Sequence, residues 1–173
     1  MSGERMETVF GKRAIPVISN ELNHVHGGLY FTASVVNAAL GASALLYIEM
    51  IIPANIEAHL KSFSFYNGDD GHFEFVEAPT LTTGATPLTA YNRNRRSVKT
   101  SGIVLKSNPT GISGGIVLDP MYFKGTNQTP GVLIRSDIEW VLKPATTYLL
   151  RLTNDGVGAE QALLKAGWCE EPA

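Results

Sequence analysis

Residues 59–76 read HLKSFSFYNGDDGHFEFV, and this stretch carries the strongest indication of fold in the chain. Side chains alternate along residues 59–66 and again along residues 72–76, where Phe73 and Phe75 share one face. The two faces of the first run are Leu60, Ser62, Ser64 and Tyr66 on one side, and Lys61, Phe63 and Phe65 on the other. Because Asn-Gly and Asp-Gly steps lie between the two runs, the pattern predicts a β-hairpin.

Further short strands are predicted on both sides of this stretch. Residues 44–52 form an apolar run that ends at Pro53. Residues 146–153 alternate, and we expect their even-numbered face to be buried. The other predicted strands cover residues 97–105, 115–118, 131–135, 138–142 and 161–170. About eight short strands separated by turn residues, with no alternation of strand and helix, predict an all-β antiparallel sandwich of jelly-roll type.

The N-terminal part of the chain has no clear hydrophobic period. Residues 1–27 are punctuated by glycine and proline, so we expect an extended arm there, with one short strand at 14–18. The β-sandwich domain is then expected to cover residues 28–173. Within it, residues 29–40 are compatible with either a helix or a strand.

Composition favours a protein that buries surface against other chains. Only 17% of the 173 residues are charged, against roughly 25% in typical soluble domains, although the chain is long enough for a full core. Cys169 is the only cysteine, so no intrachain disulfide can form, and we expect a small buried residue there. The sequence shows no signal peptide and no run of about 18 apolar residues, so we expect a soluble protein made in the cytoplasm, without membrane contact.

Motifs for catalysis or cofactor binding are weak. Serines occur without a Gly-x-Ser-x-Gly elbow, and no glycine loop for phosphate follows a predicted strand. The carboxylates of Asp119, Asp137, Glu139 and Asp155 adjoin turns or alternate outward. We therefore expect neither an enzyme nor a cofactor; a β-sandwich hydrolase, the remaining enzymatic alternative, would require a clustered acidic pair.

Histidines give no convincing metal site. In a strand, the two-residue spacing of His24 and His26 would put both imidazoles on one side, but zinc needs further ligands and none is suitably spaced. Residues 67–71 lack the spaced acidic series and closing glutamate of an EF-hand. We therefore predict no metal site. Instead, we expect His24 and His26 to form polar contacts, for example with a neighbouring subunit.

The segment YNRNRRS, residues 91–97, concentrates positive charge in a chain whose net charge is −2. Its arginines must lie at a surface, because unpaired buried guanidinium groups are costly to desolvate. Nucleic-acid binding would normally need a basic balance or interleaved aromatics, and here the pI is about 6.1. We favour a protein interface over a solvated face. The candidate interface residues are Tyr91, Arg93, Arg95, Arg96, His24 and His26.

Several segments in order resemble one family of proteins. They are FSF (63–65), EAPT (77–80), YNRNR (91–95), WVLKPATTYLL (140–150), LTN (152–154) and WCE (168–170). Together they resemble small structural proteins of tailed-bacteriophage virions, similar to the jelly-roll decoration or cement proteins on the outer face of a capsid. The resemblance covers about residues 45–171 and leaves the predicted arm outside it.

The resemblance implies a structural virion protein on the capsid surface, made in the cytoplasm of the bacterial host. Its expected partners are the major capsid protein and further copies of itself, as a homotrimer, without nucleic acid or membrane. The arm would reach onto a neighbouring subunit or the capsid, and Arg93, Arg95 and Arg96 would form charge-assisted bonds with partner groups. The alternative is a carbohydrate- or receptor-binding β-sandwich of a phage fibre or tail, which would need exposed aromatics. The candidates for those are Tyr122, Phe123 and Trp140.

Overall fold

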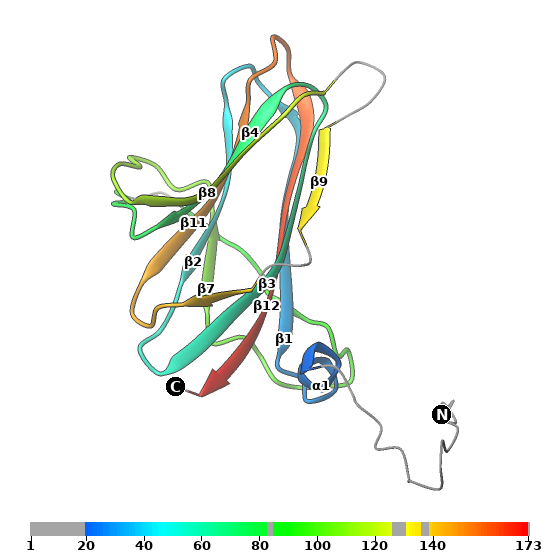
Figure 1. Cartoon of the computed structure of the whole chain (residues 1–173), viewed down its shortest axis with the longest axis vertical. Helices are drawn as coiled ribbons and strands as arrows, with labels where there is room; N and C mark the ends of the chain where they lie inside the picture. Colours follow the sequence, from blue (N-terminus) through cyan, green and yellow to red (C-terminus); the bar gives the residue numbers. More distant parts are fainter. Residues whose placement is uncertain (1–19, 83–84, 126–130, 136–138, 173) are drawn as a thin grey trace, which may run out of the picture.

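Two antiparallel sheets packed face to face make up the computed structural model (Figure 1), which confirms the predicted all-β sandwich. The structure describes residues 20–82, 85–125, 131–135 and 139–172. The first sheet has the order β10 (Trp140–Leu142), β3 (Ile56–Asn67), β12 (Glu160–Pro172), β1 (Tyr30–Leu40) and β6 (Tyr91–Asn92), and β9 (Gly131–Arg135) also pairs with β3. The second has the order β5 (Thr86–Pro87), β7 (Val104–Ser107), β2 (Leu45–Ile51), β11 (Thr147–Asn154), β4 (Gly71–Glu77) and β8 (Ile116–Phe123).

The principal strands follow the order of a jelly roll. β9 and β10 pair with successive halves of β3, so together they fill one edge position of the first sheet. When they are taken as one strand and the short β5, β6 and β7 are set aside, the first sheet holds the first, eighth, third and sixth strands of the chain. The second sheet holds the second, seventh, fourth and fifth. Consecutive strands therefore mostly change sheets, as in two interleaved Greek keys.

The predicted hairpin over residues 59–76 is wrong, although both of its strands are present. β3 and β4 belong to different sheets, and the turn between them carries the chain across the sandwich. The phenylalanines require this arrangement: Phe63 and Phe65 both stack on Phe73 of the opposite sheet, with ring centroids 4.7 Å apart in each pair. A hairpin would have placed these rings on one sheet, where Phe73 could not face Phe63 and Phe65 across the core.

The predicted faces of residues 59–66 are also partly wrong. Leu60 and Phe63 were expected on opposite faces, yet both are buried in the core. The register of β3 against β12 shifts at Lys61, which has no direct partner on the neighbouring strand. This β-bulge inserts one extra residue and reverses the alternation beyond it.

The other strand predictions are largely confirmed. Residues 147–154 form β11, and its even-numbered side chains Tyr148, Leu150 and Leu152 are buried as expected, but Leu149 on the odd-numbered face is buried too. Residues 30–40, left open between helix and strand, form β1. The strand predicted at 97–105 begins only at Val104. Cys169 is buried, and this burial raises the pKa of its thiol to about 11, so the thiol remains protonated near neutral pH.

The expectation of an extended arm is wrong for residues 20–26, which form the helix α1 (Asn20–His26). The helix ends in a Schellman motif: Leu29 N–H donates to His24 O, and Gly28 N–H donates to Val25 O. Gly28 has φ of +68°, and a Cβ there would meet the Ser97 side chain. The Gly-Gly pair that suggested a loop is therefore the end of a helix. Residues 1–19, including the strand predicted at 14–18, lie outside the described residues.

Two buried amides hold one end of the sandwich together. Asn67 ends β3 and donates from Nδ2 to Asn154 Oδ1, at 3.0 Å, at the end of β11. The carbonyls of Asp69 and Asp70 accept from Asn67 Nδ2, and those of Leu40, Gly41 and Gly158 accept from Asn154 Nδ2. The pair thus links the connections β1–β2, β3–β4 and β11–β12.

A second hydrogen-bonded cluster, in which Tyr148 and Glu77 are buried and Lys143 is exposed, lies at the other end of the sandwich. The Tyr148 hydroxyl donates to Glu77 Oε2 at 2.9 Å and accepts the Lys143 N–H at 2.9 Å. Lys143 Nζ donates to Glu77 Oε1 at 2.6 Å, and this bond is the main reason the pKa of Glu77 lies below its ordinary value. Burial raises the pKa of Tyr148 to about 12, so the hydroxyl stays a donor. This cluster fixes the corner where the chain passes from β10 to β11.

Replacing Asn154 with alanine should lower the free energy of unfolding by about 3 kcal/mol, because several buried hydrogen bonds are lost and the Asn67 amide loses one of its three acceptors. Urea denaturation followed by fluorescence of the buried Trp168 measures the change. Asn55→Ala, at an exposed position, is the matched control and should change stability by less than about 0.5 kcal/mol. Equal stabilities of the two variants would contradict the assigned role of the amide pair.

Candidate functional site

Asparagines fasten the arginine-rich segment to the sandwich; we call residues 91–99 the arginine loop. Asn92 Nδ2 donates to Gly28 O at 2.9 Å and to Lys99 O at 3.1 Å. Asn94 Nδ2 donates to His26 O at 3.0 Å, and Asn94 Oδ1 accepts the Arg96 N–H. The alternating pattern of asparagine and arginine therefore separates two roles, since the asparagines bond to backbone groups of the fold and the arginines lie exposed.

Arg93 joins the arginine loop to α1. Its Nη1 donates to Glu21 Oε1 at 2.9 Å, and its guanidinium lies 4.6 Å from the centroid of the Tyr30 ring. Both partners of this ion pair are about half exposed, so the pair itself contributes at most about 1 kcal/mol, with a similar contribution from the cation–π contact. Arg93 is therefore a structural contact as well as a surface cation.

Arg95, Arg96 and Tyr91 present the outer surface of the loop. The Arg95 guanidinium lies 5.9 Å from the centroid of the Tyr91 ring, and Tyr91 is 56% exposed. Within the described part of the chain, the Arg96 guanidinium has no hydrogen-bond or ion-pair partner. The Arg95–Tyr91 pair and the exposed Arg96 are thus carried by a loop whose backbone is fixed.

The two histidines do not share a face, as a strand would have required. They lie on α1, where residues two apart point in nearly opposite directions. His24 is 7% exposed, and its Nε2 lies 2.5 Å from Glu171 Oε1 of β12, a contact that lowers the pKa of Glu171. His26 is exposed beside the arginine loop, so five of the six predicted interface residues come together and His24 serves the packing of α1 instead.

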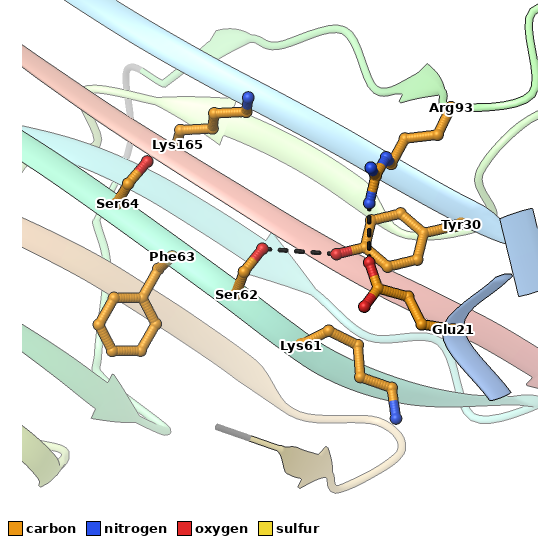
Figure 2. Close-up of a pocket in the computed structure, with 8 residues that line it drawn as sticks. All are labelled: Glu21, Tyr30, Lys61, Ser62, Phe63, Ser64, Arg93 and Lys165. Atoms are coloured by element: carbon orange, nitrogen blue, oxygen red, sulfur yellow. Dashed lines mark hydrogen bonds and ion pairs between the residues drawn. The ribbon is translucent and has the colours of Figure 1, made fainter. Parts of the chain in front are cut away.

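A polar cavity of about 340 Å³ adjoins the arginine loop, and sequence reasoning missed it. It lies on the outward face of the first sheet and is bounded by α1 and the loop (Figure 2). Its lining residues are Glu21, Tyr30, Lys61, Ser62, Phe63, Ser64, Arg93 and Lys165. Figure 2 shows Arg93 and Glu21 together at one end, and Lys165 beside Ser64 at the other.

Acidic residues flank the Lys61 side of the cavity. The Glu139 carboxylate pairs with Lys61 Nζ and with His59 Nδ1, the latter at 2.9 Å. The hydrogen bond from Lys61, followed by that from His59, keeps the pKa of Glu139 below its usual range. Glu57 bonds to the other nitrogen of His59, at 2.9 Å. The cavity is therefore locally cationic with a charged acidic border.

The aromatics expected on a sugar-binding face are mostly packed. Phe123 contacts Phe65, with centroids 5.2 Å apart, and Trp140 contacts Phe75 at 5.8 Å. Tyr122, in contrast, is 79% exposed. It borders a cavity of about 220 Å³, whose other lining residues are Asp70, Gly71, Phe123, Lys124 and Asp155.

The carboxylates at this second cavity have partners within the fold. Asp155 Oδ2 lies 2.6 Å from His72 Nδ1, and Asp70 Oδ1 accepts the Gly125 N–H at 3.0 Å. Of the other carboxylates considered for chemistry, Asp119 lies in β8 and Asp137 falls outside the described residues. No group of three or more histidine, cysteine, aspartate or glutamate side chains among the described residues could hold a metal ion. Nor does any described helix have the length and apolar character needed to cross a membrane.

No protein-family model matches the chain, and no curated protein matches it. Any assignment of function therefore rests on the segments quoted above and on the geometry of these surfaces.

Replacing Arg93 with alanine should loosen α1 without unfolding the sandwich, because the Arg93 side chain joins the helix residue Glu21 and the Tyr30 ring to the loop. Hydrogen exchange of backbone amides in residues 24–29 should accelerate about fivefold, while exchange in β3 and β12 stays unchanged. The control is Arg96→Ala, which removes the same charge from a side chain with no described partner. If both variants exchanged alike, Arg93 would not anchor the helix.

Proposed function

We propose that this chain is a structural protein that decorates or cements the capsid of a tailed phage through protein–protein interfaces. It would bind the major capsid protein on the outer surface of the virion and associate with copies of itself. The observation that carries the proposal is the arginine loop, in which a fixed backbone presents Tyr91, Arg95 and Arg96 outward. The quoted sequence segments and the jelly-roll strand order support the same class of protein.

The arginine loop has the properties of an interface before any partner binds. Arginine and tyrosine are enriched among the residues that dominate binding energy in protein interfaces. Because Asn92 and Asn94 already fix the backbone, little conformational entropy of the loop remains to be lost on binding. A solvated face would not require such fixation.

The outward face of the first sheet supports self-association. Val36, Leu163 and Tyr66 lie opposite one another in neighbouring strands and form an apolar row across β1, β12 and β3. Val36 is 55% exposed. With only 17% charged residues in the chain, covering such a row in an oligomer would remove apolar surface from water. The trimeric state itself is implied by the family resemblance.

The double variant Arg95→Ser, Arg96→Ser should bind capsids at least about tenfold more weakly, since two interface arginines each contribute about 1 kcal/mol or more. Capsids of the encoding phage, prepared without this protein, are mixed with the purified chain and sedimented, and light scattering gives the mass of the free protein. Lys106→Ser, Lys124→Ser is the control, with the same loss of charge from β7 of the other sheet and from the residue after β8. A wild-type monomer that does not bind capsids would refute the proposal.

The exposed Tyr122 favours a second candidate function, recognition of a carbohydrate or receptor by a fibre or tail module. A sugar could stack on this ring while Asp70 and Asp155 accept its hydroxyls in the adjoining cavity. On a glycan array the wild-type chain should then give hits that Tyr122→Ala loses, while Tyr91→Ala, which truncates the other strongly exposed tyrosine, keeps them. An array without hits would exclude this candidate.

A further inference from the structure

We propose that the cavity between α1, the arginine loop and the first sheet binds a single carboxylate, presented by an aspartate or glutamate side chain of a protein partner. Lys165 and the hydroxyls of Ser62 and Ser64 form the seat for this group. The choice of a protein as the source rests on the proposed function, whereas the affinity for a carboxylate does not.

The charge inside the cavity is unevenly compensated. Three cations, Lys61, Arg93 and Lys165, line it together with one carboxylate, that of Glu21. Glu21 neutralises the Arg93 end, and Glu139 neutralises Lys61 from outside the cavity. No described carboxylate pairs with Lys165. The Lys165 end is therefore the part of the cavity that attracts an anion.

Hydroxyl donors lie beside this uncompensated cation. The register of β3 against β12 places Ser64 directly opposite Lys165, and Ser62 is two residues away on the same strand. The Ser62 hydroxyl has one long contact, 3.4 Å to the Tyr30 hydroxyl, and the Ser64 hydroxyl has none among the described residues. An ammonium group and two hydroxyls can all donate to one carboxylate, and charge-assisted bonds of this kind are the stronger ones.

The acidic border selects for a small, singly charged anion. Glu21 lies inside the cavity, while Glu139 and Glu57 flank the Lys61 side. A polyanion such as nucleic acid would bring further negative charges against these carboxylates, at a cost in free energy. One side-chain carboxylate can reach Lys165 without approaching them.

The position of the cavity favours a protein as the source of the carboxylate. Arg93 belongs to both the cavity and the arginine loop, so the two surfaces are continuous. A partner that contacts Tyr91, Arg95 and Arg96 would also cover the cavity, and exclusion of water would strengthen the bond to Lys165.

The test titrates isotopically labelled protein with the peptide acetyl-Gly-Glu-Gly-amide and follows the amide signals of β3 and β12 by NMR. The neutral peptide acetyl-Gly-Gln-Gly-amide should produce no saturable shift. Lys165→Gln should weaken binding of the acidic peptide about fivefold, and Ser64→Ala should weaken it by a smaller factor. Lys124→Gln, which removes an exposed charge at the other cavity, should leave the affinity unchanged.

Each outcome decides the inference. If Lys165→Gln and Lys124→Gln weakened peptide binding equally, the peptide would be attracted to the charged surface in general, and the inference would be overturned. The inference would also be overturned if N-acetylneuraminate or inorganic phosphate saturated the site at a lower concentration than the peptide does. Peptide binding without capsid binding would leave the carboxylate seat standing and refute the proposed function. Capsid binding without any response to the peptide would refute the carboxylate seat and leave the proposed function standing.

Discussion

The hydrogen bond between the buried amides of Asn67 and Asn154 is the constraint on which the architecture depends. It joins the last residue of β3 in one sheet to the last residue of β11 in the other, and both side chains also bond to carbonyls of the adjoining connections. Because unpaired buried donors are costly, the Nδ2 groups of the two amides find their acceptors only when both sheets are in register and three connections are closed. Further along β3 and β4, Phe63 and Phe65 stack on Phe73 and fill the core between the two sheets.

This constraint also positions the candidate site. Fixing β3 fixes its register with β12, which brings Ser64 opposite Lys165, and β12 in turn places β1 and the Tyr30 ring. At the far end of β12, the Glu170 carboxylate accepts hydrogen bonds from the Trp168 indole, the Ser101 hydroxyl and the Gly102 N–H. Ser101 and Gly102 come shortly after the arginine loop in the chain, so these bonds attach that segment to β12. The same rigid strand therefore supports both the loop and the cavity.

Local sequence specified the strands but not their partners. Alternation and turn residues predicted β3, β4 and β11 within a few residues, because each strand buries one face wherever it lies in the sandwich. The choice between a hairpin and a crossover depends on which aromatic rings face one another, and this is a long-range property. The bulge at Lys61 was hidden for a related reason, since it exists only relative to the register of β12, about a hundred residues later in the chain.

The candidate site divides in the same way. The cost of burying guanidinium groups predicted that the arginines would be exposed. In the structure Arg93, Arg95 and Arg96 are all exposed. The roles of Asn92 and Asn94 could not be foreseen, because their acceptors lie at the end of a helix that the Gly-Gly signal had suggested was a loop. In Asn-Arg-Asn-Arg the short amides reach backbone carbonyls, while the longer guanidinium groups extend beyond them. A segment that looks like a simple charge cluster thus contains its own backbone anchors. A cation carried on such a backbone is worth more to an interface than one on a mobile loop, because the ordering cost of the backbone has already been met in folding.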